Sequence, residues 1–247
     1  MSERAKPLLE IAANSVASAL AAQEGGADRI ELCASLGEGG LTPSYATIAM
    51  VRERLTIPVY VLIRPRAGDF LYNELELEAM RRDIEACERL GCDGVVIGAL
   101  DADGGIAIEA CRVLIHAGRG LGVTFHRAFD LARDPVQALE HLVALGCERV
   151  LTSGQCATAI EGAPLIRKLV ERAAGRLVVM PGAGVNASNI GALREATGAS
   201  EFHASAKEML ASKMSFKPNR LADMHYGETR SDAREIRKLR TALKDKP

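Results

Sequence analysis

The sequence of 247 residues has no tryptophan, and only 4% of its residues are aromatic. It has no run of about 18 apolar residues, and its first fifteen residues lack the continuous apolar segment of a secretion signal. Its 31 Lys and Arg residues are balanced by 32 Asp and Glu residues, without a long run of one sign. These absences predict a soluble, cytoplasmic protein that binds neither a membrane nor nucleic acid.

Cysteine motifs are also scarce. There are six cysteines, but the sequence has no Cys-x-x-Cys and no Met-x-x-Met motif. Because no secretion signal is present, these cysteines are better interpreted as reduced thiols than as a disulfide framework.

A repeated segment is what the sequence does contain. In four places a glycine and a small residue, usually followed by an acidic residue, lead from a helical pattern into a short strand pattern. Glycine commonly ends a helix, so each repeat predicts a helix-to-strand junction. The four segments are GADRIELC (26–33), GCDGVVIG (91–98), GCERVLTS (146–153) and GASEFHAS (198–205).

Strand and helix therefore alternate eight times, because four further strand candidates lie between the repeats. Eight such units in a chain of this length predict a single (β/α)8 barrel. An open doubly wound sheet is the alternative, but GEGG (37–40) lacks the strand, Gly-x-Gly, helix pattern of such folds. The four further candidates are LLEIAAN (8–14), VYVLIRPR (59–66), VTFHRAFD (123–130) and LVVMPGAGV (177–185).

We expect one domain over residues 1–247, with the barrel core at about 8–206 and a C-terminal loop and helix at 207–247. Two helices should begin at Thr42-Pro43 and Asp134-Pro135, where an N-cap residue precedes proline, and Ser231 should cap the last helix. Residues 207–230 contain no clear helix, and loops longer than about 12–15 residues usually have a function. We expect this stretch to order against a second subunit or to form a lid.

Aligning the repeats on a barrel places polar residues in interior layers that are normally Val, Ile and Leu. On the odd strands, aligning VLIRP with VTFHR matches Arg64 with His126, and Glu10 lies in the first strand. Barrel enzymes keep their sites at the C-terminal ends of the strands, so the predicted catalytic residues are Glu10, Glu31, Arg64, His126 and His203. One layer would contain Glu31, Val96, Leu151 and His203, and the next Cys33, Gly98, Ser153 and Ser205.

Each of these polar residues also has a structural interpretation. Glu10 and Arg64 could form a buried structural ion pair, and an isolated His126 is more often a core histidine. Arg127 and Thr152 should face the rim or the helices, because they alternate with inward residues. Several such groups predicted in one barrel mouth nevertheless favour a functional site.

Two loops at the same end of the barrel predict an anion site. GAGV (182–185) follows the seventh strand and HASA (203–206) ends the eighth, where many barrels bind phosphate through backbone N–H groups. The predicted anion-binding residues are Arg64, Gly182, Gly184 and Ser205.

Several motifs together resemble the CutC copper homeostasis family, over residues 8 to about 206. They are LEIAANS, RIELCASLGEGGLTPS, IPVYVLIRPRAGDFLY, GVVIGALDADG, VTFHRAFD, RVLTSGQ, PGAGV and EFHASA. The resemblance implies a cytosolic (β/α)8 barrel, a homo-oligomer such as a dimer or tetramer, and a role in binding Cu(I) or controlling copper levels. The match departs at EIAAN, where other members often carry a cysteine after EI.

Two functions follow, and the sequence leaves both open. Copper binding would use Cys33, the thiol predicted inside the mouth, with His126, His203 or Met180 as a second ligand. The other residues indicate an isomerase, aldolase or lyase that acts on a small sugar-like or phosphorylated anion. In that enzyme Glu31 would be the base, His126 or His203 the acid, and Arg64 the anchor of the anion.

Overall fold

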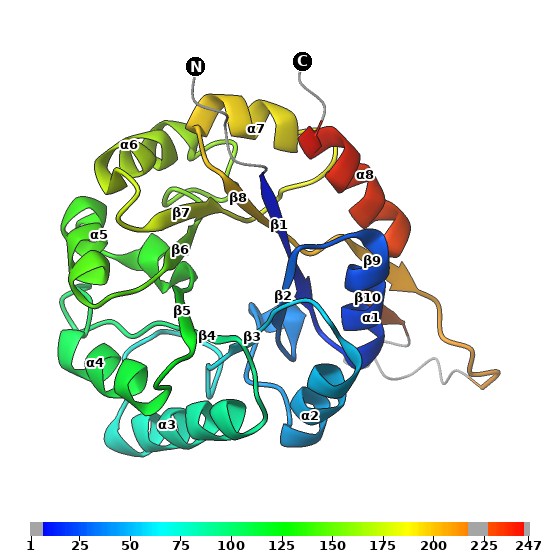
Figure 1. Cartoon of the computed structure of the whole chain (residues 1–247), viewed down its shortest axis with the longest axis horizontal. Helices are drawn as coiled ribbons and strands as arrows, with labels where there is room; N and C mark the ends of the chain where they lie inside the picture. Colours follow the sequence, from blue (N-terminus) through cyan, green and yellow to red (C-terminus); the bar gives the residue numbers. More distant parts are fainter. Residues whose placement is uncertain (1–6, 217–226, 245–247) are drawn as a thin grey trace.

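The structure, a computed structural model, describes residues 7–216 and 227–244. Eight parallel strands surround a central axis and alternate with helices on the outside (Figure 1). The hydrogen-bonded order is β7-β6-β5-β4-β3-β2-β1-β8, and β7 and β8 lie side by side where the ring closes. The predicted (β/α)8 barrel is therefore confirmed. Its strands are β1 (Leu8–Ala13), β2 (Arg29–Leu32), β3 (Val59–Leu62), β4 (Gly94–Ile97), β5 (Gly122–Phe125), β6 (Arg149–Thr152), β7 (Val178–Pro181) and β8 (Glu201–Ala204).

The helices form a ring around these strands, and α8 fills the space between α7 and α1 (Figure 1). Two short 3-10 helices follow β2 and β5 at the mouth of the barrel: η1 (Leu36–Glu38) and η2 (Arg127–Leu131). The α-helices are α1 (Val16–Gly25), α2 (Tyr45–Arg54), α3 (Glu74–Arg89), α4 (Ile108–Ala117), α5 (Pro135–Ala144), α6 (Ala163–Ala173), α7 (Ile190–Thr197) and α8 (Ala233–Lys244).

The apolar core has two parts because successive residues of a strand face opposite sides of the sheet. On β2, Ile30 and Leu32 belong to the large core between strands and helices. Glu31 and Cys33 alternate with them and line the interior of the barrel. A second, small apolar cluster inside the barrel consists of Cys33, Tyr60, Leu62 and Val96.

Of the two helix N-caps predicted before a proline, one is confirmed and the other is wrong. Asp134 caps α5 as expected, since its carboxylate accepts from the backbone N–H groups of Val136 and Gln137. The prediction at Thr42 was wrong: Ser44 caps α2, because the Thr42 hydroxyl accepts from the backbone N–H of Arg64.

The C-terminal stretch forms an antiparallel hairpin of β9 (Lys207–Leu210) and β10 (Glu228–Ser231) beside the barrel. Ser231 lies in β10 and donates to the carbonyl of Ala12, so it does not cap α8 as predicted; the Asp232 carboxylate instead accepts from the N–H of Arg234. Residues 217–226, part of the expected lid or subunit contact, lie outside the described residues. The hairpin contacts β1 and α1 of its own chain, and whether it meets a second subunit stays a prediction.

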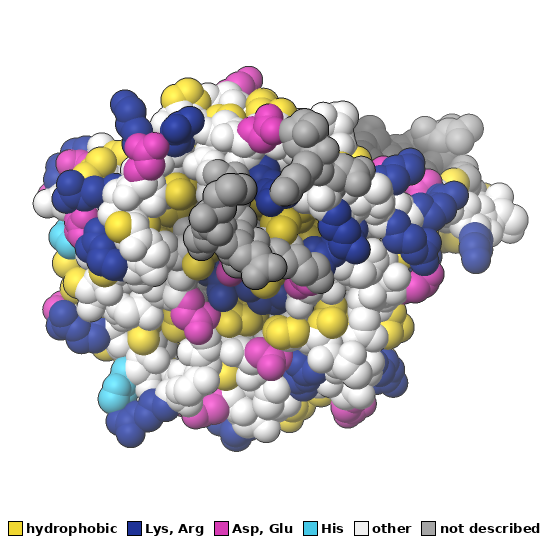
Figure 2. All heavy atoms as spheres, turned by 45° about the horizontal axis from the view of Figure 1, so that its top comes forward, with side chains coloured by type: hydrophobic (Ala, Val, Ile, Leu, Met, Phe, Trp, Pro, Cys, Tyr) yellow, Lys and Arg dark blue, Asp and Glu magenta, His cyan; other side chains and the backbone are white. Residues whose placement is uncertain are grey.

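The molecular surface shows the balanced charge of the sequence, and the cysteines are unpaired. On the face shown in Figure 2, Lys and Arg side chains are interspersed with Asp and Glu. All six cysteines are free thiols, and only Cys156 is exposed. None of the helices in residues 7–216 and 227–244 combines the length and apolarity needed to cross a membrane.

Candidate functional site

A cavity of about 570 Å³ opens at the C-terminal ends of the barrel strands. Glu10 and Gly182 are outside its lining: Glu10 lies beneath it, and Gly182 packs between Leu151 and His203. The predicted site residues that line the cavity are Glu31, Cys33, Arg64, His126, Gly184, His203 and Ser205.

Glu10 forms its ion pair with Arg29, and its other carboxylate oxygen lies 2.8 Å from His203 Nδ1. The suggested pair of Glu10 with Arg64 was therefore wrong, because Arg29 stands directly opposite Glu10 on the neighbouring strand. Burial alone would raise the pKa of Glu10, but the charge of Arg29 and the hydrogen bond from His203 outweigh it and lower the pKa to about 2. Glu10 is thus a permanent anion below the cavity.

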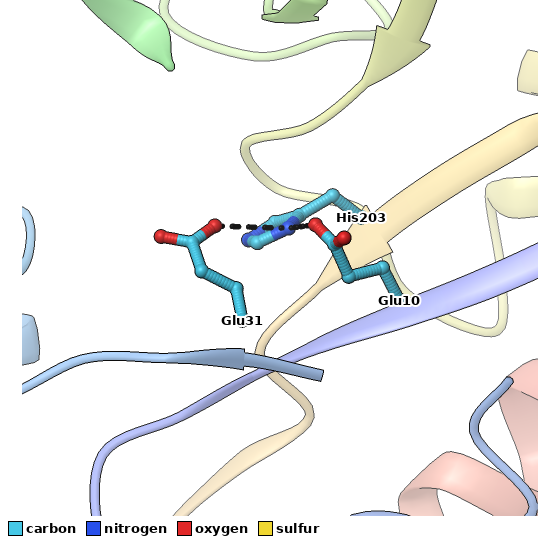
Figure 3. A group of neighbouring side chains, drawn as sticks. All are labelled: Glu10, Glu31 and His203. Carbon is cyan, nitrogen blue, oxygen red and sulfur yellow. Dashed lines mark hydrogen bonds and ion pairs between the residues drawn. The ribbon is translucent and has the colours of Figure 1, made fainter. Parts of the chain in front are cut away.

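His203 lies between the carboxylates of Glu10 and Glu31, as Figure 3 shows. Its Nδ1 donates to Glu10 and is 3.5 Å from Glu31 Oε2. Burial favours the neutral ring, but the hydrogen bond to Glu10 and the charges of the two carboxylates outweigh this and raise the pKa of His203. The three side chains form one coupled group, held on β1, β2 and β8.

Glu31 lines the cavity together with His203. Its side chain is only 8% exposed, and its Oε2 has no hydrogen-bond partner in the described part of the chain. Burial raises the pKa of Glu31 to about 7; the negative charge of Glu10 adds to this, while the charges of His203 and Arg29 oppose it. A carboxyl group with this pKa exchanges its proton readily near neutral pH.

His126 projects into the cavity from the end of β5 and presents a hydrogen-bond donor. Its Nδ1 accepts from the backbone N–H of Ala128 at 3.1 Å, so the proton of the neutral ring must be on Nε2. That Nε2 is buried without a partner among the described residues. Burial, together with the charge of Arg64, lowers the pKa of His126 to about 3, so the ring stays neutral. Gly98 permits this position, because a Cβ there would overlap the imidazole.

Arg64 lies at the cavity wall, but its guanidinium is largely occupied by the protein itself. Nη1 donates to the carbonyls of Glu38 and Gly40, and Nη2 donates to the carbonyl of Gly68, each at 2.9 Å. The group also stacks over Phe70, 5.0 Å from the ring centroid. Only Nε is left without a partner within residues 7–216 and 227–244. Arg64 therefore ties two loops together, and its predicted role as anion anchor is poorly supported.

The loop after β7 has the backbone shape expected of an anion site. Ala183 and Gly184 adopt left-handed φ values of 79° and 71° in succession, and both line the cavity. Ser205 and Lys207 line the same side from the end of β8 and from β9. Binding of an anion by Gly182, Gly184 and Ser205 stays a prediction.

Two groups of residues were missed at the sequence level. Arg127 and Asp130 line the cavity rim, although Arg127 was assigned a structural role. A further buried layer lies below the two predicted ones, and extending the repeat alignment by two residues toward the N-terminus would have found it. Its members are the buried Arg29, Gly94 and Arg149 and the partly buried Glu201.

One group in the described residues could hold a metal ion: Glu10, Glu31 and His203 offer ligand atoms within 4.8 Å of one another. Two carboxylates and an imidazole suit borderline or hard cations rather than soft ones. Cys33 lies near this group in the small apolar cluster, where burial raises the pKa of its thiol and the charge of Glu31 adds to the shift.

Comparison with known proteins identifies the family. The CutC family model matches residues 7–208. A CutC family protein of Xanthomonas axonopodis pv. citri is 56% identical over 235 residues, which cover 95% of this chain and 98% of that protein. One from Chromobacterium violaceum is 52% identical over 241 residues, which cover 96% of this chain and 98% of that protein.

A solved structure agrees with these relatives. It is described as a proposed copper homeostasis protein CutC from Streptococcus agalactiae and is 37% identical. The two structures superpose with a TM-score of 0.77, over 80% of this chain and 97% of the other. The resemblance inferred from the sequence motifs is confirmed, and the chain belongs to the CutC family.

Proposed function

We propose that this protein is an enzyme that transfers protons on a small sugar-like or phosphorylated anion held in the barrel mouth. The observation that carries the proposal is Glu31, a buried carboxyl group that faces a cavity. Its Oε2 accepts no hydrogen bond from the described residues and has only the 3.5 Å contact with His203, and its pKa of about 7 suits a general base. A carboxyl kept in this state costs stability, and a purely structural role would not require it.

The cavity residues support a reaction beside a carbonyl group. The ionised Glu31 would remove a proton from the carbon next to a substrate carbonyl, and the bonding electrons would move to form an enolate. The Nε2–H of His126 would donate a hydrogen bond to the enolate oxygen, which a neutral imidazole does without losing its proton. Returning the proton to the former carbonyl carbon, while the proton of the adjacent hydroxyl moves to the enolate oxygen, completes an isomerisation. In the aldolase or lyase alternative, Glu31 would instead take the proton of a hydroxyl on the β carbon. The bond between the α and β carbons then breaks to give an aldehyde and the same enolate, which Glu31 reprotonates at carbon.

Copper, which the family name implies, does not fit the donor atoms of this mouth. Cu(I) prefers thiolate and thioether sulfur, but the raised pKa of Cys33 keeps its thiol protonated. His126 cannot offer Nε2 to a metal while its Nδ1 accepts from Ala128. The sulfur of Met180 lies at the base of the barrel, 3.5 Å from the guanidinium of Arg29. These side chains therefore give little support to a Cu(I) site in the barrel mouth.

Proton exchange in D₂O tests the enzyme proposal without knowledge of the complete reaction. The wild type is incubated with dihydroxyacetone phosphate, ribose 5-phosphate and pyruvate, and proton NMR follows loss of the signal next to the carbonyl. Glu31→Gln should lower the exchange rate by about 100-fold or more. Glu38→Gln is the matched control, because Glu38 lines the same cavity but is exposed. Exchange that Glu31→Gln leaves unchanged contradicts the proposal.

Competition with a Cu(I) chelator tests the copper alternative. We expect wild type, Cys33→Ser and Glu31→Gln to bind Cu(I) weakly and equally, because none of them presents a thiolate in the mouth. Tight stoichiometric binding that is lost only in Cys33→Ser would favour copper and contradict the enzyme proposal. Native mass spectrometry of protein purified from cells would report any bound metal or metabolite as well.

A cytoplasmic location and a homo-oligomeric state belong to the same proposal. The free thiols support the location, and the homo-oligomeric state is the expectation stated from the family resemblance. The mass of the intact assembly and cell fractionation are the measurements that test them.

A further inference from the structure

Arg127 stands at the cavity rim directly after His126, and its guanidinium is held in a fixed orientation. Nε donates to Asp130 Oδ2 at 2.7 Å, and Nη2 donates to the hydroxyl of Ser153 at 2.8 Å. The side chain is nevertheless 44% exposed and lines the cavity. Its Nη1 has no hydrogen-bond partner in the described ranges, so the N–H groups on this nitrogen of the guanidinium remain available to a ligand.

Asp130 makes this arrangement rigid. Its side chain is 8% exposed and accepts hydrogen bonds from the hydroxyls of Thr152 and Ser153 and from the backbone N–H groups of Ser153 and Gln155. The carboxylate is thereby fixed to the loop after β6, and it fixes Arg127 in turn. An arginine that is already oriented loses little side-chain entropy when it binds a ligand.

The two arginines at the mouth, Arg64 and Arg127, differ in how many of their N–H donors remain unused. Arg64 donates three hydrogen bonds to carbonyls of its own loops, whereas Arg127 keeps Nη1 and a large exposed area. Lys207 adds a second cation to the same cavity from β9, and it forms no ion pair with another described residue. Arg127 and Lys207 therefore reach the cavity from different elements, η2 and β9, and the unused donor on the β5 and β6 side is that of Arg127.

We propose that Arg127, held by Asp130 and Ser153, binds the anionic oxygens of the substrate. This inference rests on the proposed function and deepens it, because it requires the substrate to carry a phosphate or carboxylate at the end remote from Glu31. Guanidinium binds both groups through paired N–H donors. The anionic group then lies beside β5 and β6, and the reacting carbon lies toward β2 and β8.

Calorimetric titration with inorganic phosphate and, separately, with acetate tests this assignment. Arg127→Gln should weaken the binding of the preferred anion by about 10-fold to 100-fold, the range for a lost charged hydrogen bond. Arg112→Gln is the matched control, because Arg112 is an exposed arginine on α4 away from the cavity, and it should bind as the wild type does. Tighter binding of phosphate than of acetate would identify a phosphorylated substrate, and the reverse order a carboxylate.

An Arg127→Gln variant that folds and binds both anions as tightly as the wild type overturns the inference. If that variant does not fold, the guanidinium ¹⁵N signals of the wild type replace it: the Arg127 signal should shift on addition of the anion, and an unchanged signal overturns the inference equally. The outcome is independent of the proton-exchange test. Loss of exchange in Glu31→Gln with normal anion binding in Arg127→Gln would retain the proposed function and reject the anchor.

Discussion

The interior of this barrel holds two polar regions, one at the base and one at the mouth, that differ in how completely their buried polar atoms are paired. At the base, Arg29 and Arg149 both contact Glu201, and they lie over the ring of Tyr60 with guanidinium carbons 5.1 and 4.8 Å from its centroid. Arg149 also donates to Thr124, and the Tyr60 hydroxyl donates to Glu148. At the mouth, by contrast, Glu31 Oε2, His126 Nε2 and Arg64 Nε are buried without hydrogen-bond partners among the described residues.

This difference separates a cluster whose charges compensate one another from one whose polar atoms remain available to a ligand, as the proposed function requires. Leaving a buried polar atom unpartnered costs about 1–3 kcal/mol, so a protein rarely retains three such atoms around one cavity without a use for them. Charges at the base are compensated where they are buried, and they close the lower end of the barrel. The mouth retains unpaired donors and acceptors that a ligand can satisfy.

Breaking the base should give the largest effect. Arg29→Met removes an ion-pair partner of both Glu10 and Glu201; Glu201 keeps Arg149, but the fully buried Glu10 keeps only His203. We expect the free energy of unfolding, measured by urea denaturation at pH 7, to fall by about 3–5 kcal/mol. Arg112→Met serves as the control, because its ion pair with Glu109 is exposed and should contribute less than about 1 kcal/mol. Similar losses in both variants would show that the base is not a structural cluster.

Removing a charge from the mouth should change the free energy of unfolding in the opposite direction, by increasing it. The folded pKa of Glu31, about 7, is above the unfolded value of 4.5, so folding loses stability as pH rises from 4.5 to 7. Glu31→Gln should therefore raise the free energy of unfolding by about 3 kcal/mol at pH 8 and leave it unchanged below pH 4.5. Urea denaturation at both pH values measures this difference.

Glu10→Gln is the control for this prediction, because it lies at the junction of the two regions. The pKa of Glu10 is lowered to about 2, so its stabilising contribution is present above pH 4.5 and is lost as pH falls toward 2. This variant should lose stability at pH 8. Two variants that shift stability in the same direction at pH 8 would contradict the distinction between base and mouth.

The smallest effect is a difference between two histidines that line one cavity. His203 is connected to the base through Glu10, and its pKa is raised, so it should release its proton only above pH 6.5. His126 is buried near Phe70 and Arg64, and its pKa of about 3 should keep it neutral above pH 4. Imidazole ¹⁵N shifts recorded from pH 4 to 9 measure both. A change in the His126 shifts near pH 6.5 would contradict its assignment as a neutral donor.

Much of the barrel was predictable because its signals are local and repeated. The glycine-led junctions at 26–33, 91–98, 146–153 and 198–205 all precede or include strands of the barrel. Alternation along those strands predicted that Glu31 and His203 face the interior, the match of VTFHR with VLIRP predicted the same for His126, and all three line the cavity. Even capping was partly predictable, at Asp134, where residue type and proline position agree.

Partner choice was not predictable from the same pattern. Glu10 has Arg64 and Arg29 as candidate partners, and only the register between β1 and β2 brings Arg29 opposite it. Likewise, Arg64 and Arg127 have the same side chain, but the loops at Gly40 and Gly68 occupy one guanidinium while Asp130 and Ser153 leave an edge of the other available.

The sequence by itself therefore determined the alternation of strands and helices, the inward face of each strand and the family to which the chain belongs. Tertiary structure alone decided which charges are neutralised, which imidazole nitrogen carries the proton, and which arginine remains free to bind an anion. The physical reason is that the side of a strand or helix on which a residue lies depends on residues two to four positions apart. A pKa or a hydrogen bond depends instead on groups that the closed barrel brings together from distant strands.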